Sequence, residues 1–235
     1  MVMTPLAISA SDLSVEYISQ KGIISPKRSV EFRALREIDF SISQSEIVAL
    51  LGRNGAGKST LLKTISGMVK PSAGQVITNG RVIVLAGADP GFIPGISGRK
   101  NVEELGLAYG IQKDEMEAFS KSIEEFAQLG GAYDRDYRGY STGMKGKLGF
   151  GFITSLRPEI LLIDETLGVG DREFRAKAQM RLREFIERTG TVIISTHSLG
   201  LAKELCSRGI VLDCGSIYYD GEIEGAIREY SELTN

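Results

Sequence analysis

A glycine-rich segment, GRNGAGKST at residues 52–60, has the residue types and spacing of a phosphate-binding loop. It fits the pattern G-x-x-x-x-G-K-[ST], follows the apolar run IVALL and precedes a helical pattern, LLKTISGMV. Glycines permit turns that direct successive backbone N–H groups at one anion, and the following helix adds the positive end of its dipole. The segment therefore predicts binding of a nucleoside triphosphate together with Mg²⁺.

The members of this loop have separate expected roles. Lys58 can reach the β- and γ-phosphates and so counts as catalytic as well as binding, and the Ser59 hydroxyl can coordinate Mg²⁺. The other nucleotide-contacting residues expected in the loop are Gly52, Asn54, Gly55, Gly57 and Thr60. The alternative, a glycine-rich turn with an exposed lysine, is disfavoured because strand, loop and helix patterns occur in register.

Two carboxylates follow directly after the apolar run ILLI at 160–163. Ligands of open α/β sheets bind beyond the C-terminal ends of the strands, so both acids are expected near the phosphates. Asp164 suits the metal through a coordinating water, and Glu165 is placed to polarise the attacking water as a general base. A solvated surface acid pair is the alternative, and acids that directly end four aliphatic residues are poor candidates for it.

The single histidine of the chain, His197, follows the next apolar run, TVII at 191–194. A lone histidine is more often structural than functional. This one also falls just past the end of a predicted core strand, beside a phosphate site. We therefore predict that His197 contacts the γ-phosphate and orients the water.

These residues require elements that bring strand ends together. The runs suited to buried strands are residues 47–51, 82–86, 160–163, 191–194 and 209–213. Helical patterns lie between them, at 113–129 and 172–188. Strands that alternate with helices predict an α/β fold with a largely parallel sheet covered on both faces.

Two regions depart from this alternation. Residues 1–46 have the pattern of short strands around a polar, basic loop, which predicts an N-terminal antiparallel β subdomain. Residues 98–150 are helical and punctuated by glycine, which predicts an inserted helical subdomain. We expect a single domain over residues 1–235, in which 1–97 and 151–235 form the β subdomain and the α/β core.

The composition sets limits on the class of protein. The 235 residues are 42% hydrophobic and 25% charged, which allows a large core, and the net charge of -2 gives no reason to expect nucleic acid as a partner. Cys206 and Cys214 are too few for a disulfide framework and are expected to be small buried apolar residues. No signal peptide is evident and no apolar run approaches the ~18 residues of a membrane span, so a membrane role is expected to come through a partner.

Four motifs together carry a family resemblance. GRNGAGKST, YSTGM (140–144), LLIDE and STHS occur in the order and approximate spacing of the ATP-binding cassette (ABC) ATPases. YSTGM stands where that family usually has LSGGQ. The resemblance covers essentially the whole chain, and it implies a P-loop NTPase with a RecA-like core that hydrolyses ATP with Mg²⁺.

The same resemblance implies a second copy of the chain as a partner. In ABC ATPases the YSTGM-type motif caps the γ-phosphate held by the other protomer of a head-to-tail dimer. Ser141 offers a hydroxyl and Gly143 a backbone N–H for that role. Gly170 and Asp171 match the family's loop that crosses the dimer interface. Tyr17 is the best match to its adenine-stacking aromatic, with a strand tyrosine packed on the core as an equal alternative.

The departures from the family pattern narrow the resemblance. The chain resembles the ATPase subunits that export capsular polysaccharide, O-antigen or teichoic acid in three stretches: YSTGM, the VGD after the acids, and GISGRKNV. This resemblance implies a polytopic permease as partner and a lipid-linked polysaccharide as substrate, with capsular polysaccharide or O-antigen favoured. It also implies a location at the cytoplasmic face of the bacterial inner membrane. The basic residues Lys27, Arg28, Arg33 and Arg36 could meet lipid headgroups or a lipid-linked pyrophosphate, although a solvated basic face is the simpler interpretation.

One residue of the family pattern is missing. ABC ATPases usually place a glutamine after the strand that corresponds to 82–86, where it senses Mg²⁺ and contacts the membrane partner. Here the stretch reads GADPGFIPG, and Ala88 or Asp89 falls nearest. The apolar Phe92 and Ile93 are expected to offer a docking surface for a coupling helix of the permease.

Two other classes of function compete with transport. A soluble ABC ATPase of DNA repair or of ribosomes usually carries two cassettes, a long coiled-coil insertion or a basic surface, and none is evident in this sequence. A P-loop kinase or other transferase would need an acceptor site and would have no use for YSTGM. Both alternatives are therefore less favoured than an exporter subunit.

Overall fold

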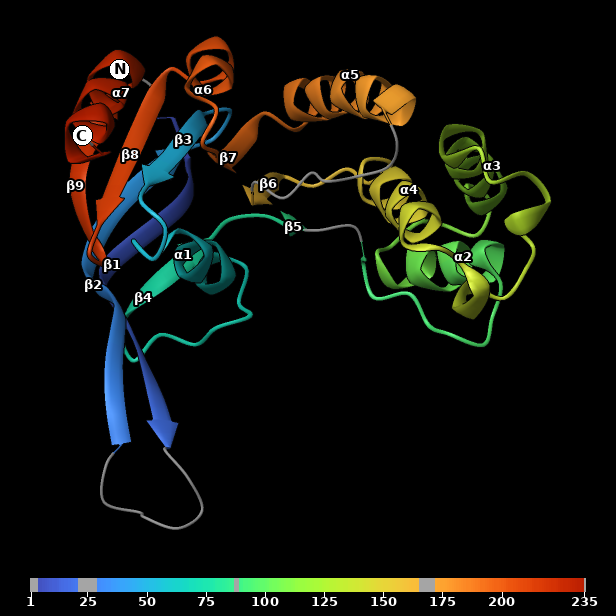
Figure 1. Cartoon of the computed structure of the whole chain (residues 1–235), viewed down its shortest axis with the longest axis horizontal. Coiled ribbons are helices and arrows are strands. Elements are labelled where there is room, and N and C mark those ends of the chain that lie inside the picture. The colour runs from blue at the N-terminus through green and yellow to red at the C-terminus, as the bar shows by residue number, and fades with distance from the viewer. Residues whose placement is uncertain (1–3, 21–28, 87–88, 165–171, 235) are drawn as a thin grey trace. The chain divides into compact units, whose positions relative to one another are not determined.

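The computed structural model describes residues 4–20, 29–86, 89–164 and 172–234 of the chain. The strands shown in Figure 1 are β1 (Leu6–Gln20), β2 (Ser29–Ser43), β3 (Ile47–Gly52), β4 (Ala73–Thr78), β5 (Val82–Ala86), β6 (Ile160–Asp164), β7 (Thr191–Ser195), β8 (Arg208–Asp213) and β9 (Ser216–Glu222). The helices are α1 (Lys58–Ile65), α2 (Gly98–Ala108), α3 (Met116–Ala127), α4 (Thr142–Ile153), α5 (Arg172–Thr189), α6 (Leu199–Leu205) and α7 (Ile223–Thr234), with short 3₁₀ turns at Gly130–Ala132 and Tyr137–Gly139.

The central sheet has six strands in the order β5-β6-β7-β3-β8-β9. Strand β3 is parallel to both β7 and β8, β6 is parallel to β7, and β9 returns antiparallel to β8. The five strands predicted from apolar runs lie within one residue of their expected bounds. All five residues of β7 are buried, as expected for a strand covered on both faces. The predicted α/β fold is therefore confirmed.

A separate antiparallel sheet has the order β2-β1-β4, which confirms the predicted N-terminal β subdomain. Strand β4 pairs with β1 between Ile8 and Ser14, whereas β2 pairs with β1 as far as Gln20. The outer half of β1 and β2 therefore forms a two-stranded ribbon, visible in Figure 1. Both strands are 15 residues long and exceed the short strands that the sequence predicted.

The β subdomain and the central sheet share one hydrophobic core. Ile8 of β1 and Ile38 of β2 are fully buried and belong to one cluster with Leu50 of β3 and with Leu61 and Leu62 of α1. Full burial of each such side chain contributes ~1.5–3 kcal/mol relative to exposure. This core fixes β3 and α1, the two elements that flank the glycine-rich loop.

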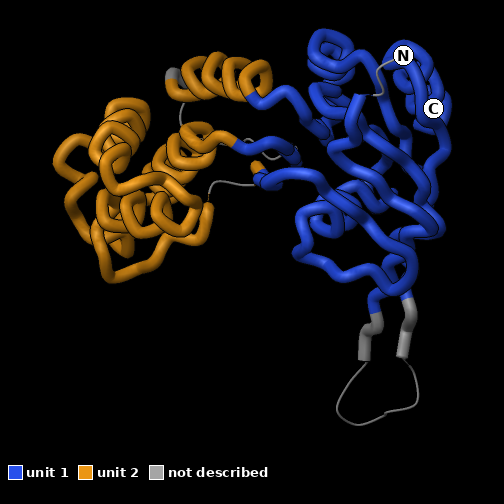
Figure 2. Tube along the Cα trace, turned by 180° about the vertical axis from the view of Figure 1, so that it is seen from behind, with its two compact units in different colours: residues 1–84, 158–165, 189–235 blue, residues 85–157, 166–188 orange. Residues whose placement is uncertain are grey.

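The chain divides into two compact units, coloured separately in Figure 2. The first contains residues 1–84, 158–165 and 189–235, and the second contains 85–157 and 166–188. The second unit includes the whole segment 98–150 and adds α5. Its core is aromatic: the rings of Phe126 and Phe174 lie 5.2 Å apart, and Arg181 of α5 donates from Nε to Thr154 Oγ1 at 2.8 Å.

The two cysteines lie in different environments. Cys206 is buried, as expected, and burial raises the pKa of its thiol to about 12. Cys214 is exposed, so the expectation that both are buried is wrong. With Gly215 it forms the two-residue turn between β8 and β9, and both residues have positive φ, 47° and 84°. Such a turn matches the twist of a hairpin, and here the Cys214 side chain is exposed to solvent.

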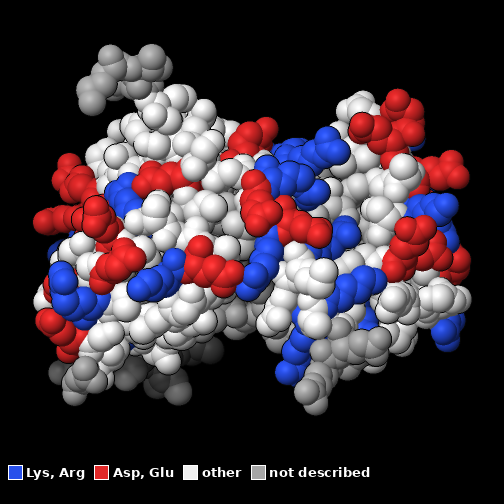
Figure 3. Space-filling model, turned by 90° about the horizontal axis from the view of Figure 1, so that it is seen from above, with Lys and Arg blue, Asp and Glu red and all other residues white. Residues whose placement is uncertain are grey.

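The surface carries both signs of charge. Lysine and arginine side chains are interspersed with aspartate and glutamate over the face shown in Figure 3, in keeping with the net charge of -2. Among the described residues, no helix combines the length and apolar character needed to cross a membrane. The same residues contain no group of three or more His, Cys, Asp or Glu side chains that could hold a metal ion by themselves.

Candidate functional site

The glycine-rich loop connects β3 to α1 in the first unit. Its shape depends on Gly57, which has φ 109° and at which a Cβ would lie only 2.7 Å from the carbonyl oxygen of Ala34. Gly55 has φ 84°, with open space around the position of its missing side chain. The left-handed backbone at both positions suits glycine, and the bare loop lets an anion approach its N–H groups.

Lys58 is the first residue of α1 and is only 9% exposed. Its Nζ donates to the carbonyl oxygens of Gly52 at 2.6 Å and Arg53 at 3.2 Å, so the ammonium group lies back over its own loop. A buried ammonium group needs acceptors or a counter-ion, and here it stands beside the positive end of the α1 dipole. The arrangement fits a phosphate group of a nucleotide.

A pocket of about 230 Å³ opens at this loop. Its lining residues are Phe32, Ala34, Asn54, Gly55, Gly57, Lys58, Ser59 and Thr60. The structure thus brings six of the loop residues expected from the sequence to one cavity. Gly52, the last residue of β3, is not among the lining residues, and a Cβ there would come within 2.5 Å of the Leu212 carbonyl oxygen.

An aromatic residue at this pocket was not predicted from the sequence. Phe32 of β2 lines the pocket and is 57% exposed. Tyr17, the predicted aromatic, is 41% exposed and pairs with Phe32 across the two strands, but it is not among the lining residues. The strand register could have indicated Phe32, because residues directly opposite in an antiparallel pair point to the same face.

The predicted acid and histidine lie at the carboxyl edge of the central sheet. Asp164 is the half-buried last residue of β6 and pairs with Ser195, the last residue of β7. Ser195 in turn pairs with Leu50 of β3, the strand that leads into the loop, and His197 follows two residues later. The Ser195 hydroxyl is buried and has no hydrogen-bond partner among the described residues. Polar groups of three neighbouring strands therefore gather at one edge.

Three predicted residues lie outside the described part of the chain. These are Glu165, Gly170 and Asp171. The same holds for Lys27 and Arg28 of the basic loop and for Ala88. Their expected roles stay predictions.

The serine-glycine segment begins α4 in the second unit. Ser141 is the N-cap of this 12-residue helix, and its Oγ accepts a hydrogen bond from the backbone N–H of Met144 at 3.2 Å. Gly143 is exposed, and a Cβ there would meet only Ser141 Oγ, at 3.9 Å. No acidic side chain stands in the first turn of α4. The helix thus presents the Ser141 hydroxyl and its exposed N-terminal residues to the surface, which suits an anion.

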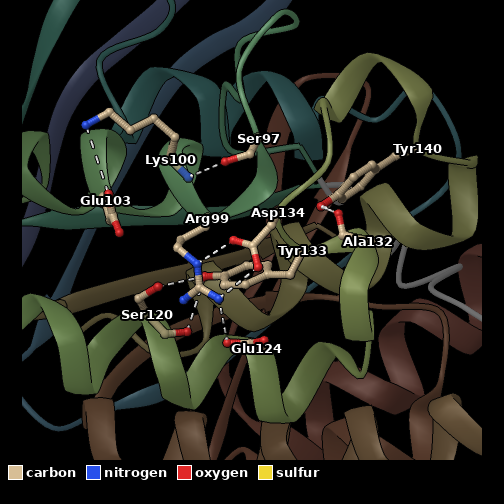
Figure 4. A network of polar contacts seen from close by, with 10 residues as sticks. All are labelled: Ser97, Arg99, Lys100, Glu103, Ser120, Glu124, Ala132, Tyr133, Asp134 and Tyr140. Carbon is tan, nitrogen blue, oxygen red and sulfur yellow. Dashed lines mark hydrogen bonds and ion pairs between the residues drawn. The ribbon is translucent and has the colours of Figure 1, made fainter.

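Tyr140, directly before this serine, is anchored from inside the unit. Its Oη donates to the carbonyl oxygen of Ala132 at 2.6 Å, and the ring is 6% exposed (Figure 4). The hydroxyl fits only because Gly98 has no side chain: a Cβ there would overlap the Tyr140 Oη and lie 3.0 Å from its Cζ. The packing of α2 against Tyr140 therefore fixes where the N-terminus of α4 begins.

An ion-pair network holds α2, α3 and the segment before Tyr140 together (Figure 4). Arg99 of α2 donates to Asp134 from Nε at 2.6 Å and to Glu124 of α3 at 3.1 Å, and its guanidinium lies 4.6 Å from the centre of the Tyr133 ring. The hydrogen bond to Arg99 lowers the pKa of Asp134. The Tyr133 hydroxyl lies 2.9 Å from Ser120 Oγ, and burial raises its pKa to about 12.

The segment where the family's glutamine is missing forms an ordered loop from Asp89 onward. Asp89 Oδ1 accepts hydrogen bonds from the N–H groups of Gly91 and Phe92, at 2.9 and 3.0 Å. Phe92 is 6% exposed and packs edge-on against Phe152, so the expectation that it docks a permease is wrong. Ile93 is 59% exposed, so its contact with a permease stays a prediction.

A phosphate loop at the end of the central parallel strand β3, with an acid at the end of β6 on the other side of β7, defines a P-loop nucleoside triphosphatase. A family model described as ABC transporter matches residues 35–168. The chain is 36% identical over 216 residues to the O-antigen export system ATP-binding protein RfbB of Klebsiella pneumoniae, covering 89% of this chain and 88% of that one.

Two further comparisons agree with this match. The chain is 39% identical to the teichoic acids export ATP-binding protein TagH of Lactococcus lactis, covering 88% of this chain and 44% of that one. Its fold resembles the ATP-binding cassette MJ0796, solved as a dimer bound to ADP and Pi, with a TM-score of 0.71, 20% identity and coverage of 92% and 98%. The chain belongs to the ABC transporter family, and it is an ATP-binding-cassette ATPase.

Proposed function

We propose that this chain is the ATP-hydrolysing subunit of a bacterial ABC exporter. It drives a lipid-linked polysaccharide, capsular polysaccharide or O-antigen, across the inner membrane through a separate polytopic permease, and it works at the cytoplasmic face of that membrane. The observation that carries the proposal is a formed phosphate pocket in a chain similar over 89% of its length to an O-antigen export ATP-binding protein.

The first unit holds the nucleotide. The loop N–H groups and Lys58 bind the β- and γ-phosphates of ATP, and Ser59 and Asp164 would hold Mg²⁺, Asp164 by way of a water. When bound, the metal neutralises charge on the phosphate oxygens. Phe32 supports the adenine ring as part of the pocket wall, and Tyr17, next to it on β1, remains the second candidate for that contact.

Hydrolysis needs a base and a group that senses the γ-phosphate. Glu165 accepts the proton of the attacking water, while His197 donates a hydrogen bond to the γ-phosphate and orients that water. Lys58 stabilises the charge on the transferred group.

The second unit acts on the nucleotide of another copy. Ser141 and Gly143 cap the γ-phosphate held by the partner of a head-to-tail dimer, and Asp171 belongs to the loop that crosses between the two chains. ATP binds the closed dimer more tightly than the open one, so its hydrolysis reopens the pair and moves the permease. The exposed N-terminus of α4 and the absence of an acid in its first turn support this role.

A mixing experiment tests the head-to-tail arrangement. Ser141→Ala should lower the rate of ATP hydrolysis by ~10²–10³ if the serine acts as a preorganised donor in the transition state. Ser122→Ala, a serine of α3 whose hydroxyl bonds to the Phe119 carbonyl at 2.8 Å, is the matched control and should keep the rate. Mixing Ser141→Ala with Lys58→Ala should restore one intact site per heterodimer. A mixture no more active than its components would refute the arrangement.

A second experiment tests the substrate class. Glu165→Gln should bind ATP without turning it over. In the native bacterium, replacing the gene with this variant should remove polysaccharide from the cell surface and accumulate its lipid-linked form inside. Surface polysaccharide at the wild-type level, or nucleic acid rather than a polytopic membrane protein in the purified complex, would favour a soluble ABC ATPase instead.

A further inference from the structure

The single histidine of the chain has a contact outside the nucleotide-binding elements. The Nδ1 atom of His197 lies 3.3 Å from the hydroxyl oxygen of Tyr230, which belongs to α7. His197 is exposed and stands between β7 and α6, whereas Tyr230 is half-buried near the end of α7. Helix α7 lies alongside α6 in Figure 1, and the two helices are in contact. The two residues are 33 positions apart.

The backbone around His197 is fixed on both sides of the residue. Thr196, 6% exposed, accepts a hydrogen bond at its Oγ1 from the N–H of Ser198 at 3.0 Å. Ser198 caps α6 and accepts from the N–H of Leu201 at 3.4 Å. These contacts hold the main chain but leave the orientation of the imidazole ring to other groups.

Helix α7 is in turn held against the sheet by close packing. Ala226 is fully buried, and a Cβ at Gly209 of β8 would lie only 2.5 Å from the Ala226 Cβ, so the helix approaches that strand at a glycine. Ile223 and Ala226 define the inner face of α7, and Tyr230 follows Ala226 by one turn on the same face. The Thr234 hydroxyl donates to the Tyr230 carbonyl at 3.0 Å and closes the last turn. The tyrosine is therefore presented by a rigid support.

We propose that Tyr230 is a positioning residue for His197: its hydroxyl donates to Nδ1 and so keeps the ring in the tautomer that carries its proton on Nε2. A neutral imidazole has one donor and one acceptor nitrogen, and the bond made by one decides the state of the other. Nε2–H is the form that donates to a phosphate oxygen. The opposite tautomer would direct a lone pair at that oxygen and would be repelled.

This inference rests on the proposed contact of His197 with the γ-phosphate. It adds α7 to the elements that support catalysis, although α7 contributes nothing to the phosphate pocket. A distance of 3.3 Å is long for a strong O–H···N bond, and catalytic hydrogen bonds often shorten only when substrate binds. Partners of this kind typically alter activity without touching the substrate.

The test uses the full chain and its unique histidine. In protein carrying ¹⁵N-labelled histidine, in mildly alkaline buffer where an ordinary imidazole is neutral, the two ring nitrogens should give well-separated signals in the wild type. Tyr230→Phe keeps the ring but removes the hydroxyl, and it should move the two signals toward each other. Tyr218→Phe is the matched control, because Tyr218 is 52% exposed on β9, and it should leave both signals unchanged.

Kinetics then separate positioning from a merely structural role. Tyr230→Phe should lower kcat by roughly 3- to 10-fold, the range of one neutral hydrogen bond, with the KM for ATP changed by less than about twofold. In the His197→Ala background the same change should have no further effect on kcat. A variant that only loosened α7 would lose thermal stability in both backgrounds and would leave the ring signals separated.

Two results would overturn the inference. Ring signals that do not respond to Tyr230→Phe would show that the hydroxyl does not fix the tautomer. Signals that respond while kcat stays at the wild-type value would show that the tautomer has no part in turnover. Failure of the proposed function has a different signature: His197→Ala would then hydrolyse ATP at the wild-type rate, whatever the ring signals of the Tyr230 variant.

Discussion

Replacing Gly98 by alanine is expected to displace the tyrosine that precedes the serine-glycine segment. Gly98 is the first residue of α2, and a Cβ there would overlap the Tyr140 hydroxyl and lie 3.1 Å from the Tyr133 carbonyl oxygen. Tyr140 has little room to retreat, because its Oη is bonded to Ala132 and its ring centre lies 5.2 Å from that of Tyr137. The methyl group therefore cannot be accommodated without loss of a contact.

The magnitude follows from three effects. Forcing a methyl group into a packed site costs about 1–3 kcal/mol. If Tyr140 moves, the carbonyl of Ala132, a residue only 3% exposed, loses its partner at a further cost of about 1–3 kcal/mol. Alanine gains about 0.5–1 kcal/mol over glycine in a helix. The first two effects partly replace one another, because Tyr140 either stays and is crowded or moves and loses its hydrogen bond. We therefore expect Gly98→Ala to lower the free energy of unfolding by about 1–3 kcal/mol.

A double-mutant cycle isolates the contact. Tyr140→Phe alone should cost about 1–2 kcal/mol through the lost hydrogen bond. In that background the overlapping hydroxyl is absent, so Gly98→Ala should cost at least about 1 kcal/mol less than it does in the wild type. Gly139→Ala is the control: nothing lies within 4 Å of a Cβ built there, and the change should stay within about 0.5 kcal/mol.

The assay is urea unfolding followed by circular dichroism, since the chain contains no tryptophan. Thermal melting should agree, at about 2–4 °C per kcal/mol for a domain of this size. The reasoning fails if Gly98→Ala is no more destabilising than Gly139→Ala. It fails equally if Gly98→Ala costs the same with and without the Tyr140 hydroxyl, because the predicted coupling would then be zero.

The remaining predictions concern the pocket, a thiol and an acidic side chain. Phe32→Ala should raise the Kd for ATP by roughly 5- to 100-fold, the value of one base–aromatic stack, and more than Tyr17→Ala does; calorimetry on both variants decides which ring carries the contact. Cys206 should resist thiol reagents until the chain is unfolded, because burial raises its pKa to about 12, while the exposed cysteine reacts at once. Asp136 has a lowered pKa because it accepts backbone hydrogen bonds, above all from Arg138. Its contribution to folding stability is therefore fully present above its pKa in the unfolded chain, about 3.9, and is lost as the pH falls through its lower pKa in the folded protein. Asp136→Asn should therefore melt below the wild type at neutral pH, with the gap closing in acid, and a gap that stays constant with pH would contradict this assignment.

Much of the fold could be predicted because its signals are local. Each strand of the central sheet that leads toward the site is a short apolar run with a polar or glycine residue at its end, as in β3, β6 and β7. The phosphate loop is local as well, since strand, glycines and helix follow one another directly in the chain. The edge that gathers Asp164 and His197 then follows from the rule for parallel sheets.

The features that were missed depend on contacts between distant segments. Phe32 reaches the pocket only through the register of β2 against β1, which no run of residues in β2 reveals. The fit of Tyr140 against Gly98 joins residues 42 positions apart with no periodic pattern between them. Phe92 is apolar in an otherwise glycine- and proline-rich loop, and only the aromatic core of the second unit shows that it faces inward.

The two halves of the proposed site are each made rigid by their own unit. Lys58 is held by the loop that it follows, and Ser141 is held through Tyr140 by α2 and by the ion pairs of Arg99. Neither half needs the other in order to take its shape. When a nucleotide binds between two such preformed halves, little of its binding free energy is used to reshape either half. Most of the difference in its binding free energy between the open and closed arrangements can therefore favour the closed one. A transport ATPase needs this property, because the free energy of ATP binding must change the relative position of the two halves and must not be consumed in folding them locally.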